Sequence, residues 1–224
     1  MITLYHGSTS KFEKPIFGFR NSKDDFGQGF YCTQDHELAT EWAVKTGVDG
    51  LVNEYSIDDS KLKFLDLKSG MFNIMSWIAI LLENRTFALS SAVARLGHDY
   101  ILSNFSQDLK DYDVLIGYRA DNSNFSYIND FLNNAISLRQ LTLAIEQTNP
   151  KEQYVLKSMK AFELLRFKEA LPVSVNQCGY EGQLRDLKAR HHYFSKVCNE
   201  VSVSDLFIKD MILSTIDVDR LSWN

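Results

Sequence analysis

The segment from Phe26 to Ala43, FGQGFYCTQDHELATEWA, constrains the fold most because it joins a glycine turn to a strand and then to a helix. Phe30 to Thr33 has the composition of a short strand. Thr33 is placed to cap the helix, and Asp35 and Glu37 would lie in its first turn, where the helix dipole favours acidic side chains. One face of this helix is predicted to carry Leu38, Ala39, Trp42 and Ala43.

The two glycines of this segment, Gly27 and Gly29, do not complete a nucleotide-binding fingerprint. The dinucleotide motif needs a third glycine three residues further on, where this chain has Cys32. A P-loop is excluded as well, because no Gly-Lys-Ser or Gly-Lys-Thr follows. Taken alone, the pair therefore indicates a tight turn that lets the backbone come close to a neighbour.

The composition is that of an ordinary globular protein rather than of a basic nucleic-acid-binding protein or a membrane protein. The 224 residues carry a net charge of −5, which argues against nonspecific binding of nucleic acid by a broadly basic surface. The longest apolar run, Met71 to Leu82, is shorter than the roughly 20 residues of a membrane span and predicts a buried helix. Three cysteines and no recognisable signal peptide predict a cytoplasmic protein.

The pattern of apolar residues along the chain predicts an α+β fold with short strands and a helical insertion. A turn is expected at Asp121 and Asn122, and breaks in helical segments at Asn84-Arg85 and at Gly179 and Gly182. Strands are expected at 2–8, 51–58, 62–67, 112–120 and 152–158, with a further one in the sequence FKEAL. Helices are expected within 69–105, 125–148 and 159–165 and from residue 173 onward.

Two weaker patterns lie outside these elements. Cys178, His191, His192 and Cys198 could suggest a metal site, but they lack the C-x-x-C spacing of structural zinc sites, so no metal is predicted. Cys32 is expected to be a small buried hydrophobic residue. The charged stretch QLRDLKARHHYFSK is expected to be a solvated helix face, with a partner-binding helix as the alternative.

Three short motifs carry a resemblance to a known superfamily. LYHGS closes the first predicted strand, FGQGFYCT precedes the predicted helix, and EQYVL begins a late strand. In this order they resemble the ADP-ribosyltransferase superfamily of the His–Tyr–Glu type, which includes the poly(ADP-ribose) polymerases and diphtheria toxin. The chain is also similar to a bacterial family of uncharacterised ADP-ribosyltransferase-like proteins, in which glutamine can occupy the third motif. The resemblance covers roughly Met1 to Phe167.

The resemblance implies that NAD is the substrate. His6 would hold a ribose hydroxyl, and the Gly7 backbone and neighbouring Ser8 would lie at the nicotinamide amide. Tyr31 and Trp42 would stack on the two faces of the nicotinamide ring. The predicted NAD contacts therefore comprise His6, Gly7, Ser8, Tyr31, Ala39 and Trp42, although Ala39 replaces a serine that usually donates a hydrogen bond.

The third motif departs from the usual pattern, since Gln153 stands where the superfamily has a glutamate. A carboxylate about 4 Å from the developing positive charge is worth about 4 kcal/mol at an effective dielectric near 20, and an amide supplies only part of it. Glu152 should face the opposite side of the strand. Glu54, in NEYSI, imitates the motif but comes too early in the chain. His6, Tyr31 and Gln153 form the predicted catalytic set.

With glutamine in the third motif, the resemblance implies a mono-ADP-ribosyltransferase, a bacterial glycosyltransferase with toxin-like character. Its acceptor could be a protein, a nucleic acid or a small molecule, and a small neutralising partner protein is possible. The alternative is a catalytically silent module that binds NAD or ADP-ribose. The implied fold is a split pair of small antiparallel sheets in residues 1–170, with a helical extension packed on it in residues 171–224.

Overall fold

The structure is a computed structural model that describes residues 1–18, 23–44, 47–178 and 181–214. The chain forms two compact units, each assembled from separate stretches of sequence. The first unit comprises residues 1–67, 108–119 and 151–183, and the second comprises residues 68–107, 120–150 and 184–224. The division therefore does not follow the expected boundary at residue 170, which falls inside a strand, β7 (Leu165–Val173).

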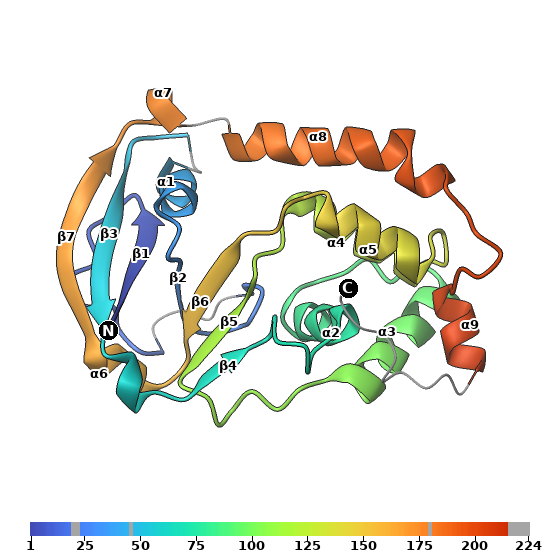
Figure 1. The fold of residues 1–224 in the computed structure, drawn as a ribbon, viewed down its shortest axis with the longest axis horizontal. Helices are drawn as coiled ribbons and strands as arrows, with labels where there is room; N and C mark the ends of the chain where they lie inside the picture. Colours follow the sequence, from blue (N-terminus) through green and yellow to red (C-terminus); the bar gives the residue numbers. More distant parts are fainter. Residues whose placement is uncertain (19–22, 45–46, 179–180, 215–224) are drawn as a thin grey trace. The chain divides into compact units, whose positions relative to one another are not determined.

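Both sheets belong to the first unit (Figure 1). The first sheet has the order β1-β3-β7, with β1 at Ile2–Ser8 and β3 at Gly50–Ile57, and its strands are antiparallel. The second has the order β2-β6-β5-β4, with these strands at Phe30–Cys32, Glu152–Leu156, Val114–Tyr118 and Phe64–Asp66.

The α+β class predicted from the sequence is confirmed, but the expectation of purely antiparallel sheets is wrong for one pair. β4 and β5 run parallel, with Phe64 opposite Val114. Parallel neighbours need a long crossover connection rather than a hairpin, and residues 68–107 between these strands supply one.

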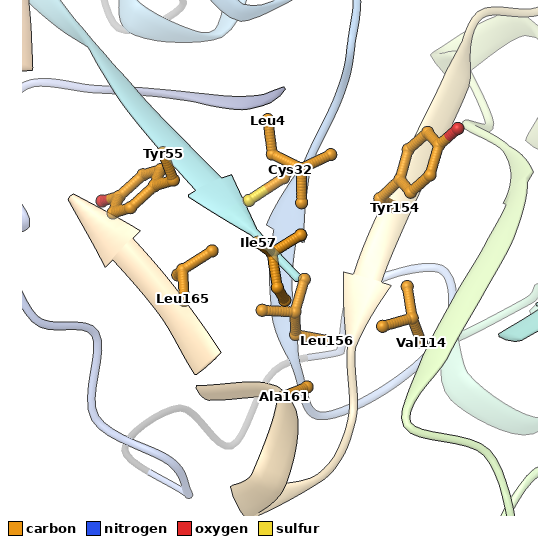
Figure 2. Packing of buried hydrophobic residues seen from close by; sticks show 9 residues of the cluster. All are labelled: Leu4, Cys32, Tyr55, Ile57, Val114, Tyr154, Leu156, Ala161 and Leu165. Atoms are coloured by element: carbon orange, nitrogen blue, oxygen red, sulfur yellow. The ribbon is translucent and has the colours of Figure 1, made fainter. Parts of the chain in front are cut away.

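Buried side chains from both sheets meet in one hydrophobic cluster (Figure 2). Leu4 and Ile57 come from the first sheet, while Cys32 and Leu156 come from the second, and all are almost completely buried. Burial raises the pKa of the Cys32 thiol well above its ordinary value, so this thiol stays protonated. The prediction that Cys32 is a small buried hydrophobic residue is confirmed.

The helix after β2 begins later than the sequence predicted. α1 spans His36–Val44, and Asp35 caps it: its Oδ1 accepts hydrogen bonds from the backbone N–H groups of Glu37 (2.9 Å) and Leu38 (3.2 Å). The prediction of Thr33 as the cap is wrong. Thr33 instead donates from its hydroxyl to the Glu152 carbonyl at 2.9 Å and so ties the end of β2 to β6.

The backbone of α1 packs directly on β1 because Gly7 has no side chain. A Cβ added at Gly7 would lie 1.8 Å from the carbonyl oxygen of Ala39 and 2.5 Å from the backbone nitrogen of Ala43. Gly50, on β3, meets the same helix, where an added Cβ would lie 2.1 Å from the Ala43 carbonyl oxygen. Glycine at these positions therefore sets how closely α1 approaches the first sheet.

The remaining elements of the first unit are short. A 3-10 turn, η1 (Asp59–Lys61), follows β3, and α6 (Met159–Leu164) connects β6 to β7. α7 (Val175–Cys178) follows β7. Of the predicted helix breaks near here, Gly179 lies outside the described residues.

The second unit is helical. Its elements are α2 (Ile74–Asn84), α3 (Ala92–Phe105), α4 (Asn122–Leu132), α5 (Leu138–Glu146), α8 (Glu181–Ser195), η2 (Val197–Asn199) and α9 (Ile208–Leu213). The first three residues of α8 are counted with the first unit, and the rest of this helix belongs to the second. The predicted break after Asn84 is confirmed. The predicted turn at Asp121-Asn122 is wrong because α4 begins there. The predicted break near Gly179 and Gly182 agrees with the end of α7 at Cys178 and the start of α8 at Glu181, and Gly182 itself lies in the first turn of α8.

Polar contacts join the C-terminal helices to the inserted ones. Tyr193, on α8, donates its hydroxyl to Asp130 of α4 at 2.5 Å, and Asp186 accepts from the Ser123 backbone N–H at 2.9 Å. The Gln140 side chain donates to the Val197 carbonyl at 2.9 Å. The predicted buried helix in the run Met71–Leu82 is confirmed as α2, and no described helix is long and apolar enough to cross a membrane.

We predict that Gly7→Ala lowers the free energy of unfolding by about 1 to 3 kcal/mol, because the new methyl group collides with backbone that cannot rotate away. Urea denaturation followed by circular dichroism measures the change. Gly70→Ala is the matched control, since nothing lies within 4 Å of a Cβ at Gly70. Equal stability of the two variants would contradict the close packing of α1 on β1.

Candidate functional site

The two sheets are joined at one pair of residues, and a pocket opens beside this junction. Tyr5 donates its backbone N–H to the Thr33 carbonyl at 2.7 Å, and Thr33 donates to the Tyr5 carbonyl at 2.9 Å. One residue further along β1, His6 Nδ1 lies 2.7 Å from the Tyr31 carbonyl oxygen. A carbonyl only accepts, so Nδ1 carries the proton and Nε2 is the acceptor nitrogen of the neutral ring.

The pocket has a volume of about 470 Å³ and lies within the first unit. Five of the residues that the sequence implicated lie on its wall: His6, Gly7, Ser8, Tyr31 and Trp42. Its other lining residues are Thr9, Phe12, Pro15, Ile16, Phe17, Gly18, Gln28, Gly29, Phe30, Lys157 and Phe162. Residues from β1, β2, α1 and the end of β6 therefore come together at one cavity.

His6 is held within a group of aromatic rings. Its ring centroid lies 4.6 Å from that of Phe30 and 5.7 Å from that of Phe12. The loop that carries Phe12 is fixed by the fully buried Asn53, whose side chain accepts from the Phe12 backbone N–H at 2.9 Å and donates to the His6 carbonyl at 3.2 Å. The Tyr55 hydroxyl also donates to the Phe12 carbonyl. The imidazole is thus oriented by contacts on several sides.

Tyr31 and Trp42 are the two wall residues that the sequence predicted to stack on a flat ring. The Tyr31 hydroxyl donates to the Gly27 carbonyl at 2.6 Å and accepts from the Phe26 backbone N–H at 3.0 Å. These bonds use the hydroxyl to hold the preceding loop. Trp42 is half-buried, and the Arg119 guanidinium lies 5.9 Å from its ring centroid. Stacking is the interaction that these two side chains are equipped to make.

The two glycines of FGQGFYCT are required for different structural reasons. Gly27 has a φ of 71°, in the left-handed region that favours glycine. Gly29 lies against β6, where an added Cβ would be 2.5 Å from a methyl carbon of Val155. The predicted tight turn and close backbone approach are confirmed, and the close neighbour in this structure is β6.

Gln153 lies outside the pocket wall and is only 2% exposed. Its Nε2 is 3.3 Å from Oδ2 of Asp25, which is itself 7% exposed. Because a carboxylate only accepts, this contact fixes the amide with its nitrogen toward Asp25. The chain therefore places a carboxylate beside the residue that stands in the position of the superfamily's glutamate. Nothing in the local sequence linked these residues, which are 128 positions apart.

Ala39 also lies outside the pocket wall, although the sequence grouped it with the NAD contacts. It is fully buried in a small cluster with Ala43 and Val52. Its carbonyl oxygen is the atom that a Cβ added at Gly7 would meet first. Its role in this structure is therefore to let α1 pack on the sheet. Glu54, which imitates the third motif, lies on β3 opposite Tyr5 and does not line the pocket.

Lys157 is a pocket residue that the sequence did not single out. It follows the end of β6, and its Nζ donates to the carbonyls of Phe26 (2.7 Å) and Gln28 (2.5 Å). Burial lowers the pKa of Lys157 below its ordinary value. A lysine four residues beyond Gln153 carries no motif signal, because its position in the pocket depends on a loop about 130 residues earlier.

The described residues include no group of three or more His, Cys, Asp or Glu side chains that could hold a metal ion. The side chain of Cys178, part of the weak metal pattern, is not among those described. The Cys198 thiol donates to the Phe194 carbonyl at 3.4 Å, within the second unit.

Comparison with known families places this chain in one of them. Residues 2–167 match the family described as Protein of unknown function (DUF3990), and the chain belongs to that family. No curated protein and no solved structure matches the chain. The matched region begins at β1 and ends within β7, so it contains the whole of the second sheet, most of the first and every residue named above for the pocket wall.

We predict that Gln153→Glu destabilises the protein at neutral pH, because it sets a second carboxylate against Asp25 in a buried position. The folded pair would hold a proton that the unfolded chain releases above about pH 4 to 5, so the loss of stability grows as the pH rises from 5 to 8. Urea denaturation at both pH values measures it.

The double variant Asp25→Asn with Gln153→Glu is the matched control. It restores an amide–carboxylate pair with the donor on the other side, so its stability should return toward that of the unchanged protein. A Gln153→Glu variant whose stability has the same pH dependence as the unchanged protein would show that the two side chains do not interact.

Proposed function

We propose that this protein is an NAD-dependent mono-ADP-ribosyltransferase of the glycosyltransferase class. The observation that carries the proposal is the pocket beside the β1–β2 junction, whose wall includes His6, Gly7, Tyr31 and Trp42. Three of these come from the two motifs that resemble the ADP-ribosyltransferase superfamily, and Trp42 comes from the helix that follows. A volume of about 470 Å³ is within the range of small-molecule sites.

The chemistry of the wall suits a flat, cationic ring. An aromatic face attracts a cation by about 0.5 to 2 kcal/mol, and the rings of Tyr31 and Trp42 are the predicted contacts for nicotinamide. His6, with its Nδ1 proton donated to the Tyr31 carbonyl, would accept a hydrogen bond from a ribose hydroxyl at Nε2. The Gly7 and Ser8 positions beside it would receive the nicotinamide amide.

The proposed reaction breaks the bond between the ribose C1 carbon and the nicotinamide nitrogen. The electron pair of that bond leaves with neutral nicotinamide, and positive charge builds on the ribose. An acceptor nucleophile then bonds to C1 and loses its proton. Gln153 would orient the ribose through hydrogen bonds, and Asp25 behind it would contribute negative potential at this charge.

The position of Gln153 also supports the second candidate, a catalytically silent module that binds NAD or ADP-ribose. Gln153 can touch a ribose only if the loop that carries Asp25 and Phe26 shifts, since the side chain is almost fully buried. That loop is held by the Tyr31 hydroxyl and by Lys157. An enzyme with this arrangement is expected to turn over NAD slowly. A binding module is expected not to turn it over at all.

The acceptor of the proposed transfer remains open among proteins, nucleic acids and small molecules. A toxin-like bacterial role, with a small neutralising partner protein, and a cytoplasmic location complete the proposal. The resemblance to the superfamily supports the toxin-like role and the neutralising partner. The sparse, odd set of three cysteines supports the cytoplasmic location.

We predict that the protein releases nicotinamide from labelled NAD in the presence of cell extract and that His6→Ala lowers the rate at least tenfold. Chromatography of the released nicotinamide measures the rate. His98→Ala is the matched control because His98 lies on α3 in the second unit, and it should leave the rate unchanged. No release above the His6→Ala level would exclude the transferase.

Binding without release would instead establish the silent module. We predict that NAD raises the melting temperature of the unchanged protein and that Trp42→Ala weakens binding about three- to thirtyfold, as expected when one stacking face is lost. Trp42→Phe should retain part of the affinity, because it keeps a ring. Equal affinity of the alanine variant and the unchanged protein would remove Trp42 from the site.

A further inference from the structure

The pocket has a charge opposite to that of the chain as a whole. The protein has 29 acidic and 24 basic residues apart from histidine, yet no aspartate or glutamate is among the described residues that line the pocket. The ionisable side chains on its wall are Lys157, His6 and Tyr31. A pocket whose described lining includes a lysine and no carboxylate favours an anionic ligand.

Lys157 is the centre of this positive charge. Its ammonium group is partly buried and donates to two backbone carbonyls, those of Phe26 and Gln28. Within the described part of the chain it forms no ion pair. An ammonium has three protons, so one further donor is available beyond these two bonds. A partly buried cation that meets only carbonyl dipoles gains from an anion more than an exposed lysine does.

Neighbouring groups on the wall extend the site for a phosphate. Ser8 and Thr9 carry hydroxyls, and the Gln28 amide is positioned by its donation to the Gly18 carbonyl at 3.1 Å. The rings of Phe12 and Phe162 lie on the same wall. The pocket thus combines a cation and polar donors with apolar rings, which suits a ligand that has both phosphate and flat groups.

We propose that Lys157 binds the pyrophosphate of a dinucleotide in this pocket. The inference rests on the proposed function for the identity of the dinucleotide, and it adds a binding residue and a charged subsite to it. Lys157 also ties the ligand to the loop before β2, since the same ammonium group holds the carbonyls of Phe26 and Gln28. Burial lowers the pKa of Lys157, and an anion bound at the ammonium group would raise it again.

Isothermal titration of the unchanged protein with ADP-ribose, adenosine, inorganic pyrophosphate and nicotinamide tests the subsite first. ADP-ribose should bind at least tenfold more tightly than adenosine, and raised salt should weaken ADP-ribose but not nicotinamide. Equal binding of ADP-ribose and adenosine would overturn the proposal. This comparison needs no variant and no turnover.

Substitution then assigns the subsite to Lys157. Lys157→Met should weaken ADP-ribose about tenfold to a hundredfold, the range for loss of a hydrogen bond to a charged group, and should leave nicotinamide binding unchanged. Lys157→Arg should retain most of the affinity. Lys168→Met is the matched control, because it removes the same charge from an exposed position on β7 outside the pocket.

The outcomes separate this inference from the proposed function. Nicotinamide release with unchanged ADP-ribose affinity in Lys157→Met would overturn the inference and leave the function standing. Binding of inorganic pyrophosphate that depends on Lys157, with no binding of NAD, would support the anion subsite and overturn the function. If Lys157→Met does not fold, as its melting curve would show, the ligand series and Lys157→Arg decide the matter.

Discussion

The pair of backbone hydrogen bonds between Tyr5 and Thr33 is the contact on which the pocket depends. It joins β1 of one sheet to the chain that follows β2 of the other. The His6 ring adds a third bond across the same junction by donating to the Tyr31 carbonyl. His6 and Tyr31 therefore hold a fixed relation to each other, because each lies on a strand and the bond joins the two strands directly.

A second constraint on the packing comes from glycines, which have no side chain to keep neighbouring backbone away. Because Gly7 and Gly50 admit the α1 backbone against the first sheet, Trp42 reaches the pocket wall while Ala39 stays buried. Gly29 allows the same close approach to β6. Two of the motif glycines thus have packing reasons that are independent of any ligand, so their presence alone does not argue for NAD.

Local patterns predicted most of the strands, the break after α2, and the burial of Cys32. They did not predict features that depend on partners far along the chain. Thr33 had the residue type of a helix cap, but its hydroxyl bonds to Glu152. Asp25 and Lys157 belong to the site through contacts spanning more than 120 positions. The parallel pairing of β4 and the two-unit division are non-local for the same reason.

The buried contact of Gln153 with Asp25 sets the arrangement apart from a site with a free catalytic carboxylate. The most direct test of the account is a crystal structure of the protein with a non-hydrolysable NAD analogue. We expect a nicotinamide ring against Tyr31 and Trp42, with the pyrophosphate within hydrogen-bond distance of Lys157. An analogue bound elsewhere, or an empty pocket at saturating analogue, would contradict it.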